Sequence, residues 1–134
     1  MPWWQALMRR SGLGQWGEEH VAKLYEQQGF QVIAKNYRAQ GGKQVGEIDL
    51  IALRGRELVF IEVKTRTNQA FGTGAESVTD AKQRKLVRAC KHYLQKHPEF
   101  SDYQYRIDVA IVTSDLDRQD ASVTILPNAV DDRN

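Results

Sequence analysis

Two charged residues interrupt an otherwise apolar run, Leu58-Val59-Phe60-Ile61-Glu62-Val63-Lys64-Thr65. A run of this composition is typical of a buried strand. Because side chains alternate along a strand, Glu62 and Lys64 point to the same face. A carboxylate and an ammonium group in a buried strand are costly unless both have partners. The pattern therefore indicates either a buried ion pair or a functional site.

A second predicted strand lies just upstream and reads Val45-Gly46-Glu47-Ile48-Asp49-Leu50-Ile51-Ala52-Leu53. The two strands are separated by Arg54-Gly55-Arg56-Glu57, in which a two-residue loop of Gly55 and Arg56 suits a type II′ turn. The segment therefore predicts a β-hairpin. A three-residue loop would shift the register by one residue and reverse the face of every side chain.

In the register of the two-residue loop, Asp49 faces Glu62 and Glu47 faces Lys64. Facing residues of antiparallel strands have Cβ atoms about 4.5–5.5 Å apart, so the Asp49 and Glu62 carboxylates repel each other. A divalent cation between them would turn this repulsion into binding, and Mg²⁺ prefers oxygen ligands. The alternative is a sheet edge without metal that carries two cross-strand ion pairs, Glu47 with Lys64 and Asp49 with Arg66.

The composition is that of one globular domain. The chain has 134 residues, of which 27% are charged and 41% hydrophobic, and this is enough for a single core. No apolar run approaches the roughly 20 residues of a membrane span. A single cysteine, Cys90, and the lack of a secretory signal pattern predict a cytoplasmic protein that does not bind a membrane. The net charge of +2 combines a moderately basic body with a mildly acidic end, which is compatible with a nucleic-acid partner.

The other segments alternate between helical and strand patterns. Periodicity and capping signals predict helices over residues 14–28 and from Ser77 or Thr79 to about residue 97, strands over residues 30–37, 45–53, 57–66, 103–113 and 122–126, and turns over residues 39–44 and 67–75. The order α-β-β-β-α-β, with one further β, predicts an α/β fold with a mixed central sheet flanked by helices. We expect an N-terminal extension over residues 1–13, a single domain over 14–127 and a C-terminal tail over 128–134.

The second predicted helix is rich in basic residues. They are Lys82, Arg84, Lys85, Arg88, Lys91 and Lys96. Such a face is either a solvated outer surface or a ridge that contacts phosphates. Lys82 and Gln83 are the best candidates to reach a substrate because they lie in the first turns after a loop, although Gln83 is equally compatible with a plain helix surface.

Several motifs of the chain resemble the YraN family, a group of small, poorly characterised bacterial proteins. The motifs are Gly17-Glu18, Gly46-Glu47-Ile48-Asp49-Leu50-Ile51, Phe60-Ile61-Glu62-Val63-Lys64-Thr65-Arg66, Lys82 and Arg106-Ile107-Asp108. That family is similar to the restriction-endonuclease-like superfamily, which includes archaeal Holliday junction resolvases. The resemblance implies a restriction-endonuclease-like αβββαβ core.

The resemblance also assigns roles to individual residues. Glu18 corresponds to the acid of the first helix, Asp49 to the metal-binding aspartate, and Glu62 with Lys64 to the Glu-x-Lys pair. The helical pattern agrees with the first assignment, because Glu18 shares the apolar face of its helix. Its neighbour Glu19 is expected at the surface.

The activity that the resemblance implies is metal-dependent phosphodiester hydrolysis, as an endonuclease acting on branched or single-stranded DNA. We expect one or two Mg²⁺ (or Mn²⁺) ions at Asp49, Glu62 and the carbonyl of Val63, with Glu18 completing the shell directly or through water. Lys64 would orient the attacking water or stabilise the charge of the transition state.

Arg66, Lys82 and Gln83 are the predicted nucleic-acid contacts. Arg106 and Asp108 share a strand face and either support the site or form a structural pair. Two other functions stay open, a nucleic-acid-binding module on a nuclease-like fold with little or no cleavage, and a protein-interaction domain. Junction-cutting relatives imply a homodimer, for which the sequence identifies no surface.

Overall fold

A computed structural model describes residues 14–39, 46–67, 79–114 and 121–131. The elements in these ranges are α2 (Gly14–Gln27), β1 (Gln31–Arg38), β2 (Glu47–Arg54), β3 (Glu57–Thr67), α3 (Asp80–Lys96), the 3-10 turn η3 (Pro98–Phe100), β4 (Gln104–Ser114) and β5 (Ala121–Leu126). The predicted order of helices and strands is confirmed. The predicted N-terminal extension, the Ser77 cap and most of the two predicted turns lie outside the described residues.

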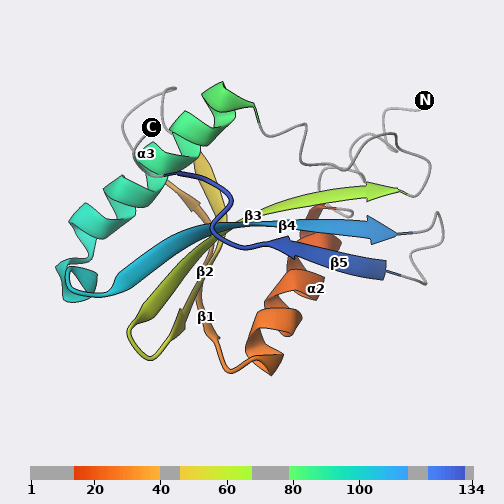
Figure 1. The fold of residues 1–134 in the computed structure, drawn as a ribbon, viewed down its shortest axis with the longest axis horizontal. Coiled ribbons are helices and arrows are strands. Elements are labelled where there is room, and N and C mark those ends of the chain that lie inside the picture. The colour runs from red at the N-terminus through yellow and green to blue at the C-terminus, as the bar shows by residue number, and fades with distance from the viewer. Residues whose placement is uncertain (1–13, 40–45, 68–78, 115–120, 132–134) are drawn as a thin grey trace.

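The described strands form one mixed sheet in the order β1-β2-β3-β4-β5. Neighbours pair antiparallel except for β3 and β4, which are parallel and are connected through α3. Helix α3 covers one face of the sheet and α2 covers the other, as Figure 1 shows. The predicted α/β architecture with a mixed sheet between helices is therefore confirmed.

Each face of the sheet builds its own hydrophobic cluster. Alternation along β3 directs Phe60 into the cluster under α3 and Ile61 into the cluster under α2. Both side chains are fully buried. The sheet is therefore the centre of the core, and residues on opposite faces of one strand contact different helices.

The hairpin between β2 and β3 has the predicted two-residue loop. Gly55 has a φ of 59°, which glycine adopts without steric cost, and Arg54 pairs with Glu57. Backbone pairing then continues as far as Leu50 and Ile61. Beyond that point β3 stays paired with β4 on its other side, while β2 and β3 separate.

Local signals place the first turn of α3. The side chain of Thr79 caps the helix and accepts a hydrogen bond from the Lys82 amide at 3.3 Å. Lys96 is the last helical residue, and Pro98 follows. Neither helix among the described residues is long and apolar enough to cross a membrane.

Arg106 and Asp108 form a structural network and do not line the candidate site. The Asp108 side chain is fully buried and accepts hydrogen bonds from Tyr25 Oη (2.7 Å), Arg106 Nε (3.0 Å) and the Asn128 amide (2.9 Å). Arg106 also forms an ion pair with Glu57. Since a buried carboxylate needs such partners, the network ties α2, β3 and β4 to the end of the chain. Of the two roles left open for this pair, the structural one is observed.

The chain that follows β5 packs back onto the sheet. The Ala129 amide donates to the Ile107 carbonyl at 2.9 Å, and Val130 is buried in the cluster under α3. Val130 lies beyond the predicted domain boundary at residue 127, yet it contributes to the core.

Candidate active site

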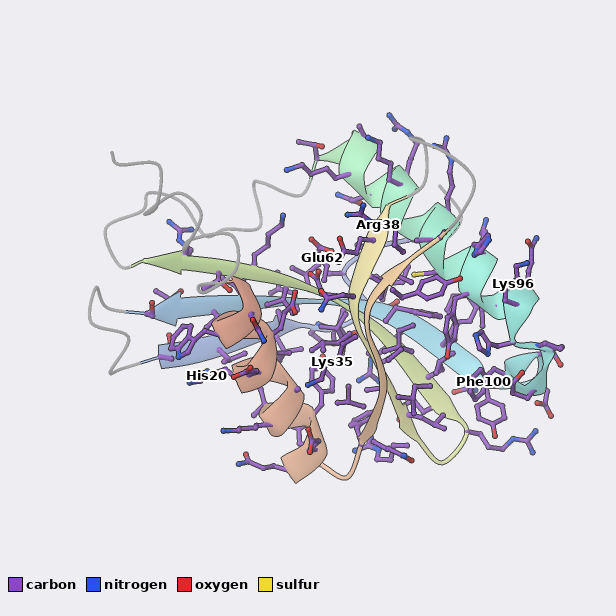
Figure 2. All side chains as sticks on the ribbon, turned by 180° about the vertical axis from the view of Figure 1, so that it is seen from behind. His20, Lys35, Arg38, Glu62, Lys96 and Phe100 are labelled. Atoms are coloured by element: carbon purple, nitrogen blue, oxygen red, sulfur yellow. The ribbon has the colours of Figure 1, made fainter. Side chains whose placement is uncertain are left out.

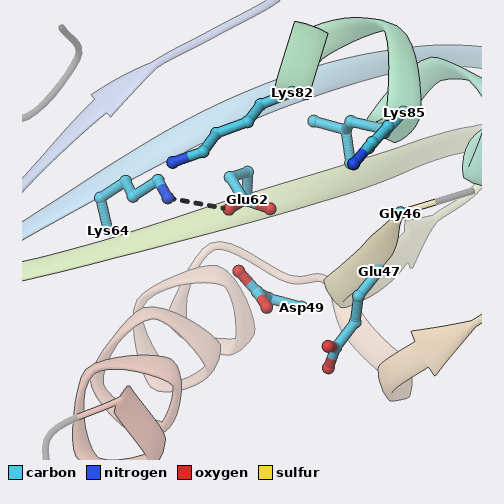
Figure 3. Close-up of a pocket in the computed structure, with 8 residues that line it drawn as sticks. Gly46, Glu47, Asp49, Glu62, Lys64, Lys82 and Lys85 are labelled. Atoms are coloured by element: carbon cyan, nitrogen blue, oxygen red, sulfur yellow. Dashed lines mark ion pairs between the residues drawn. The ribbon is translucent and has the colours of Figure 1, made fainter. Parts of the chain in front are cut away.

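The separation of β2 and β3 opens a pocket beside the first turns of α3. At the point of separation the Val63 amide donates to Asp49 Oδ2 at 2.7 Å. A side chain thus accepts the hydrogen bond that a backbone carbonyl of β2 would accept in a continuous ladder. The pocket has a volume of about 240 Å³ and is lined by Gly46, Glu47, Asp49, Glu62, Lys64, Lys82, Lys85 and Leu86 (Figure 3).

Two carboxylates converge in this pocket. Burial and the charge of Asp49 together raise the pKa of Glu62 to about 7, against the opposing effect of Lys64. Burial also raises the pKa of Asp49, while the hydrogen bond from the Val63 amide lowers it. Negative charge on this pair is therefore disfavoured, and a cation would be attracted to it.

Helix α2 brings a third carboxylate close to the pair. Burial, followed by the charges of Asp49 and Glu47, raises the pKa of Glu18 to about 7, although the Asn36 hydrogen bond lowers it. With its amide nitrogen turned toward the acids, Asn36 donates to Glu18 Oε1 (3.1 Å) and Glu47 Oε1 (3.2 Å). Glu18 is partly buried and Glu19 is exposed, so the predicted orientation of α2 is confirmed.

Two glycines allow the helices to approach the site closely. A Cβ atom on Gly17 of α2 would overlap Thr65 Oγ1 of β3. The Gly46 amide donates to the Lys85 carbonyl at 3.2 Å, and a Cβ there would lie 3.2 Å from the Lys85 backbone. These contacts set the positions of both helices relative to the carboxylates.

Three ammonium groups surround the carboxylate pair. Lys64 Nζ lies 3.5 Å from Glu62 Oε1, and Figure 3 shows the side chains of Lys82 and Lys85 extending toward the pocket from α3. Lys82 and Lys85 are one turn apart and therefore share this side of the helix. The pocket thus combines oxygen donors for a cation with positive charges for an anionic substrate.

The structure gathers most of the predicted site residues at this pocket. Asp49, Glu62, Lys64 and Lys82 line it, and Val63 contributes its backbone beside it. Glu18 lies next to Asp49, as its pKa indicates.

Two predicted contacts do not line the pocket. They are Arg66 and Gln83, both half-buried, in β3 and α3.

The alternative with two cross-strand ion pairs is wrong. Among the residues that the structure describes, Lys64 pairs with Glu62, and Glu47 pairs with Arg38 at 3.3 Å. Neither Glu47 with Lys64 nor Asp49 with Arg66 forms a pair there. Because β2 and β3 part beyond Leu50, the register that would place Glu47 opposite Lys64 is not continued, and Arg66 would not lie opposite Asp49 in that register.

Sequence reasoning missed Glu47, Asn36 and Lys85 as members of the site. Glu47 is two residues from Asp49, and Lys85 is three residues from Lys82, so strand and helix periodicity could have found both. Asn36 lies on β1 with a φ of 53°, and no pattern in the sequence signals its position.

The donor set of the pocket suits a divalent cation that keeps most of its waters. Within the described ranges, no three or more His, Cys, Asp or Glu side chains are arranged to hold a metal ion. The Asp49–Glu62 pair offers two carboxylates, which is the number through which Mg²⁺ is usually bound while it keeps several waters. The residues present therefore fit a water-rich Mg²⁺ or Mn²⁺ site.

Comparison with known proteins places the chain in a family. The model of Uncharacterised protein family UPF0102 matches residues 17–112, a range that includes every residue lining the pocket. The chain belongs to this family. The YraN resemblance of the motifs is thereby confirmed at the level of the family.

Relatives named UPF0102 protein occur in several bacteria. One from Acinetobacter baumannii (strain AYE) is 40% identical over 97 residues, covering 72% of this chain and 70% of that protein. One from Roseiflexus castenholzii is 36% identical over 124 residues, covering 92% and 97%. One from Caldicellulosiruptor saccharolyticus is 32% identical over 122 residues, covering 91% and 99%. Because these names state no activity, function has to be argued from the site.

Proposed function

We propose that the protein is a metal-dependent nuclease that hydrolyses phosphodiester bonds in nucleic acid, on a restriction-endonuclease-like core. The observation that carries this proposal is the convergence of the Asp49 and Glu62 carboxylates where β2 and β3 part. Lys64 and Lys82 line the same pocket. The αβββαβ order of elements supports the assignment of the core.

Asp49, Glu62 and the Val63 carbonyl would hold the cation. The amide and carbonyl of one strand residue point to the same side, and the Val63 amide already reaches Asp49. The Val63 carbonyl is therefore directed into the same gap, and Glu18 stands close enough to hold a water of the shell. When bound, Mg²⁺ or Mn²⁺ supplies a water of lowered pKa and neutralises charge that builds on the phosphate.

The lysines would act on the substrate. Lys64, paired with Glu62, is placed to orient the attacking water or to stabilise the negative charge of the transition state. Lys82 would act as a point charge on a phosphate next to the scissile one. Arg66 and Gln83 remain proposed contacts outside the pocket.

DNA is the proposed substrate, in a branched or single-stranded form. A homodimer would place two sites on two strands of a branched molecule, which is the arrangement that a junction-cutting enzyme needs.

A cleavage assay tests the proposal. Purified protein is incubated with labelled single-stranded, duplex, flap and four-way-junction DNA, and with matching RNA, in Mg²⁺, Mn²⁺ or EDTA. We expect cleavage that requires the metal and falls by about 100-fold or more in Asp49→Asn and Glu62→Gln, because each removes a ligand of the cation.

Two exposed acids supply matched controls. Asp102→Asn and Glu19→Gln make the same changes away from the pocket and should leave the rate unchanged. Cleavage that survives in Asp49→Asn would show that a contaminating nuclease or another site is responsible. If the wild-type protein and the variants all bind the nucleic acid but none cleaves it, the result would favour the nucleic-acid-binding module instead.

A further inference from the structure

The solvent face of α3 is strongly basic. Six residues, here named the basic ridge, are all exposed: Lys82, Arg84, Lys85, Arg88, Lys91 and Lys96. Asp80, in the first turn, is the only acid in the sequence of this helix. Leu86, Val87, Cys90 and Tyr93 are buried and define the opposite face against the sheet. The basic ridge therefore occupies the full length of the outer face.

Basic residues within the basic ridge are spaced so that their charges repel each other when no anion is bound. Arg84 and Arg88 are four residues apart, and Lys85, Arg88 and Lys91 follow one another at intervals of three, which are spacings at which like charges repel. A merely solvated helix face usually mixes both signs. Among the residues that the structure describes, Arg84, Lys85 and Lys91 form no ion pair with a carboxylate. A polyanion bound along the helix would relieve this repulsion.

The basic ridge begins at the pocket and leads away from it. Lys82 and Lys85 line the pocket, and Figure 2 shows Lys96 near the opposite end of α3 from Glu62. The 17 residues of α3 span about 25 Å at a rise of about 1.5 Å per residue. In a B-form duplex, the phosphates of one strand are about 3.4 Å apart along the helix axis. The ridge is therefore long enough for about seven of them.

We propose that the basic ridge binds the phosphate backbone of the nucleic-acid strand over about seven nucleotides that lead away from the pocket. This inference rests on the proposed function, to which it adds the path and the length of the substrate. Lys82 and Lys85 would contact phosphates next to the scissile bond, and Lys91 and Lys96 would contact the distant ones.

Binding measured in EDTA tests this path without cleavage. Fluorescence anisotropy measures the affinity for labelled DNA strands of about four and about sixteen nucleotides over a range of NaCl concentrations. Each phosphate-binding charge that is removed should reduce the slope of log affinity against log salt concentration by about 0.7–0.9. We expect Lys91→Ala to lower the slope for the long strand by about this amount, and Lys91→Ala/Lys96→Ala by about twice as much. Affinity for the short strand should stay unchanged, because that strand does not reach the far end of α3.

Lys23→Ala is the matched control, because Lys23 is an exposed lysine on α2, on the other face of the sheet. It should leave the salt slope unchanged. The proposal is overturned if the far-end variants keep the slope of the wild type, if they lose affinity equally for both strand lengths, or if no strand binds. Binding with the expected slopes but no hydrolysis under any metal condition would support binding at the basic ridge and rule out the nuclease assignment. Hydrolysis with slopes that the far-end variants leave unchanged would support the nuclease and rule out binding along the basic ridge.

Discussion

Burial and the nearby charge of Asp49 make ionisation of the Glu62 carboxyl group unfavourable at neutral pH. Its pKa in the folded protein is about 7, above the ordinary value of 4.5. Folding stability linked to this group is therefore greatest below pH 4.5 and is lost as the pH rises to about 7. Without metal at pH 8, we expect Glu62→Gln to raise the free energy of unfolding by about 1–3 kcal/mol. Urea denaturation at pH 8 measures this change.

The same variant should match the wild type at pH 4, where Glu62 is protonated in both the folded and the unfolded states. Glu19→Gln, at an exposed position, should change the stability at neither pH. A loss of stability in Glu62→Gln at pH 8 would mean that the ion pair with Lys64 outweighs the effect of burial.

Periodicity predicted Glu62 and Lys64 and could have predicted Glu47 and Lys85, but it gives no signal for Asn36. Glu62 and Lys64 were predicted because an alternating strand places them on one face. Asn36 escaped prediction because β1 contains a register shift between Val32 and Ala34, which breaks the alternation. Its left-handed backbone then places it between Glu18 and Glu47, an arrangement that depends on tertiary contacts.

The contact between α2 and β3 has no space for a side chain at Gly17. We expect Gly17→Ala to lower the free energy of unfolding by about 1–3 kcal/mol, because the added methyl group would overlap Thr65 Oγ1. Adding Thr65→Ala should recover part of this loss, since it removes the overlapping atom. Thr65 Oγ1 is buried and makes no hydrogen bond with the described residues, so its removal breaks no hydrogen bond among them. A double-mutant cycle by urea denaturation measures the coupling, and strictly additive losses would contradict this packing.

The helices and strands themselves were predictable because their signals are local. Thr79 caps α3, Pro98 follows its end, and Gly55 fixes the hairpin loop and hence the register down to Leu50 and Ile61. The separation of β2 and β3 beyond that pair was not predictable. It depends on a hydrogen bond between the Val63 amide and the Asp49 side chain, and no propensity of either residue signals it.

The stability of the whole protein should depend on pH and on metal together. Glu18 and Glu62 both have a pKa near 7, so between pH 4.5 and 7 the folded state binds more protons than the unfolded state. Stability without metal therefore falls as the pH rises through this range. If Mg²⁺ binds at the site as proposed, saturating Mg²⁺ at pH 8 should raise the Tm by several degrees, because the cation would bind the ionised carboxylates of the folded state alone. Differential scanning calorimetry at pH 5 and pH 8 should show a much smaller Mg²⁺ effect at pH 5.

Asp49→Asn/Glu62→Gln provides the comparison for this experiment and should show no Mg²⁺ effect at pH 8. An equal rise of the Tm in that variant would place the cation elsewhere in the protein. A Tm that rises from pH 4.5 to 7 in the absence of metal would contradict the role of the buried carboxylates.

The network around Asp108 has a consequence for how the domain is made. Its hydroxyl partner, Tyr25, comes from 83 residues earlier in the chain, and its amide partner, Asn128, comes from 20 residues later. During synthesis from the N-terminus, Tyr25 and Arg106 are made before Asn128, and until Asn128 joins the fold the buried Asp108 side chain lacks one of its donors. The domain therefore reaches full stability only after the segment around Asn128 has been made, and a chain truncated before residue 128 would present an incompletely closed domain to chaperones and proteases.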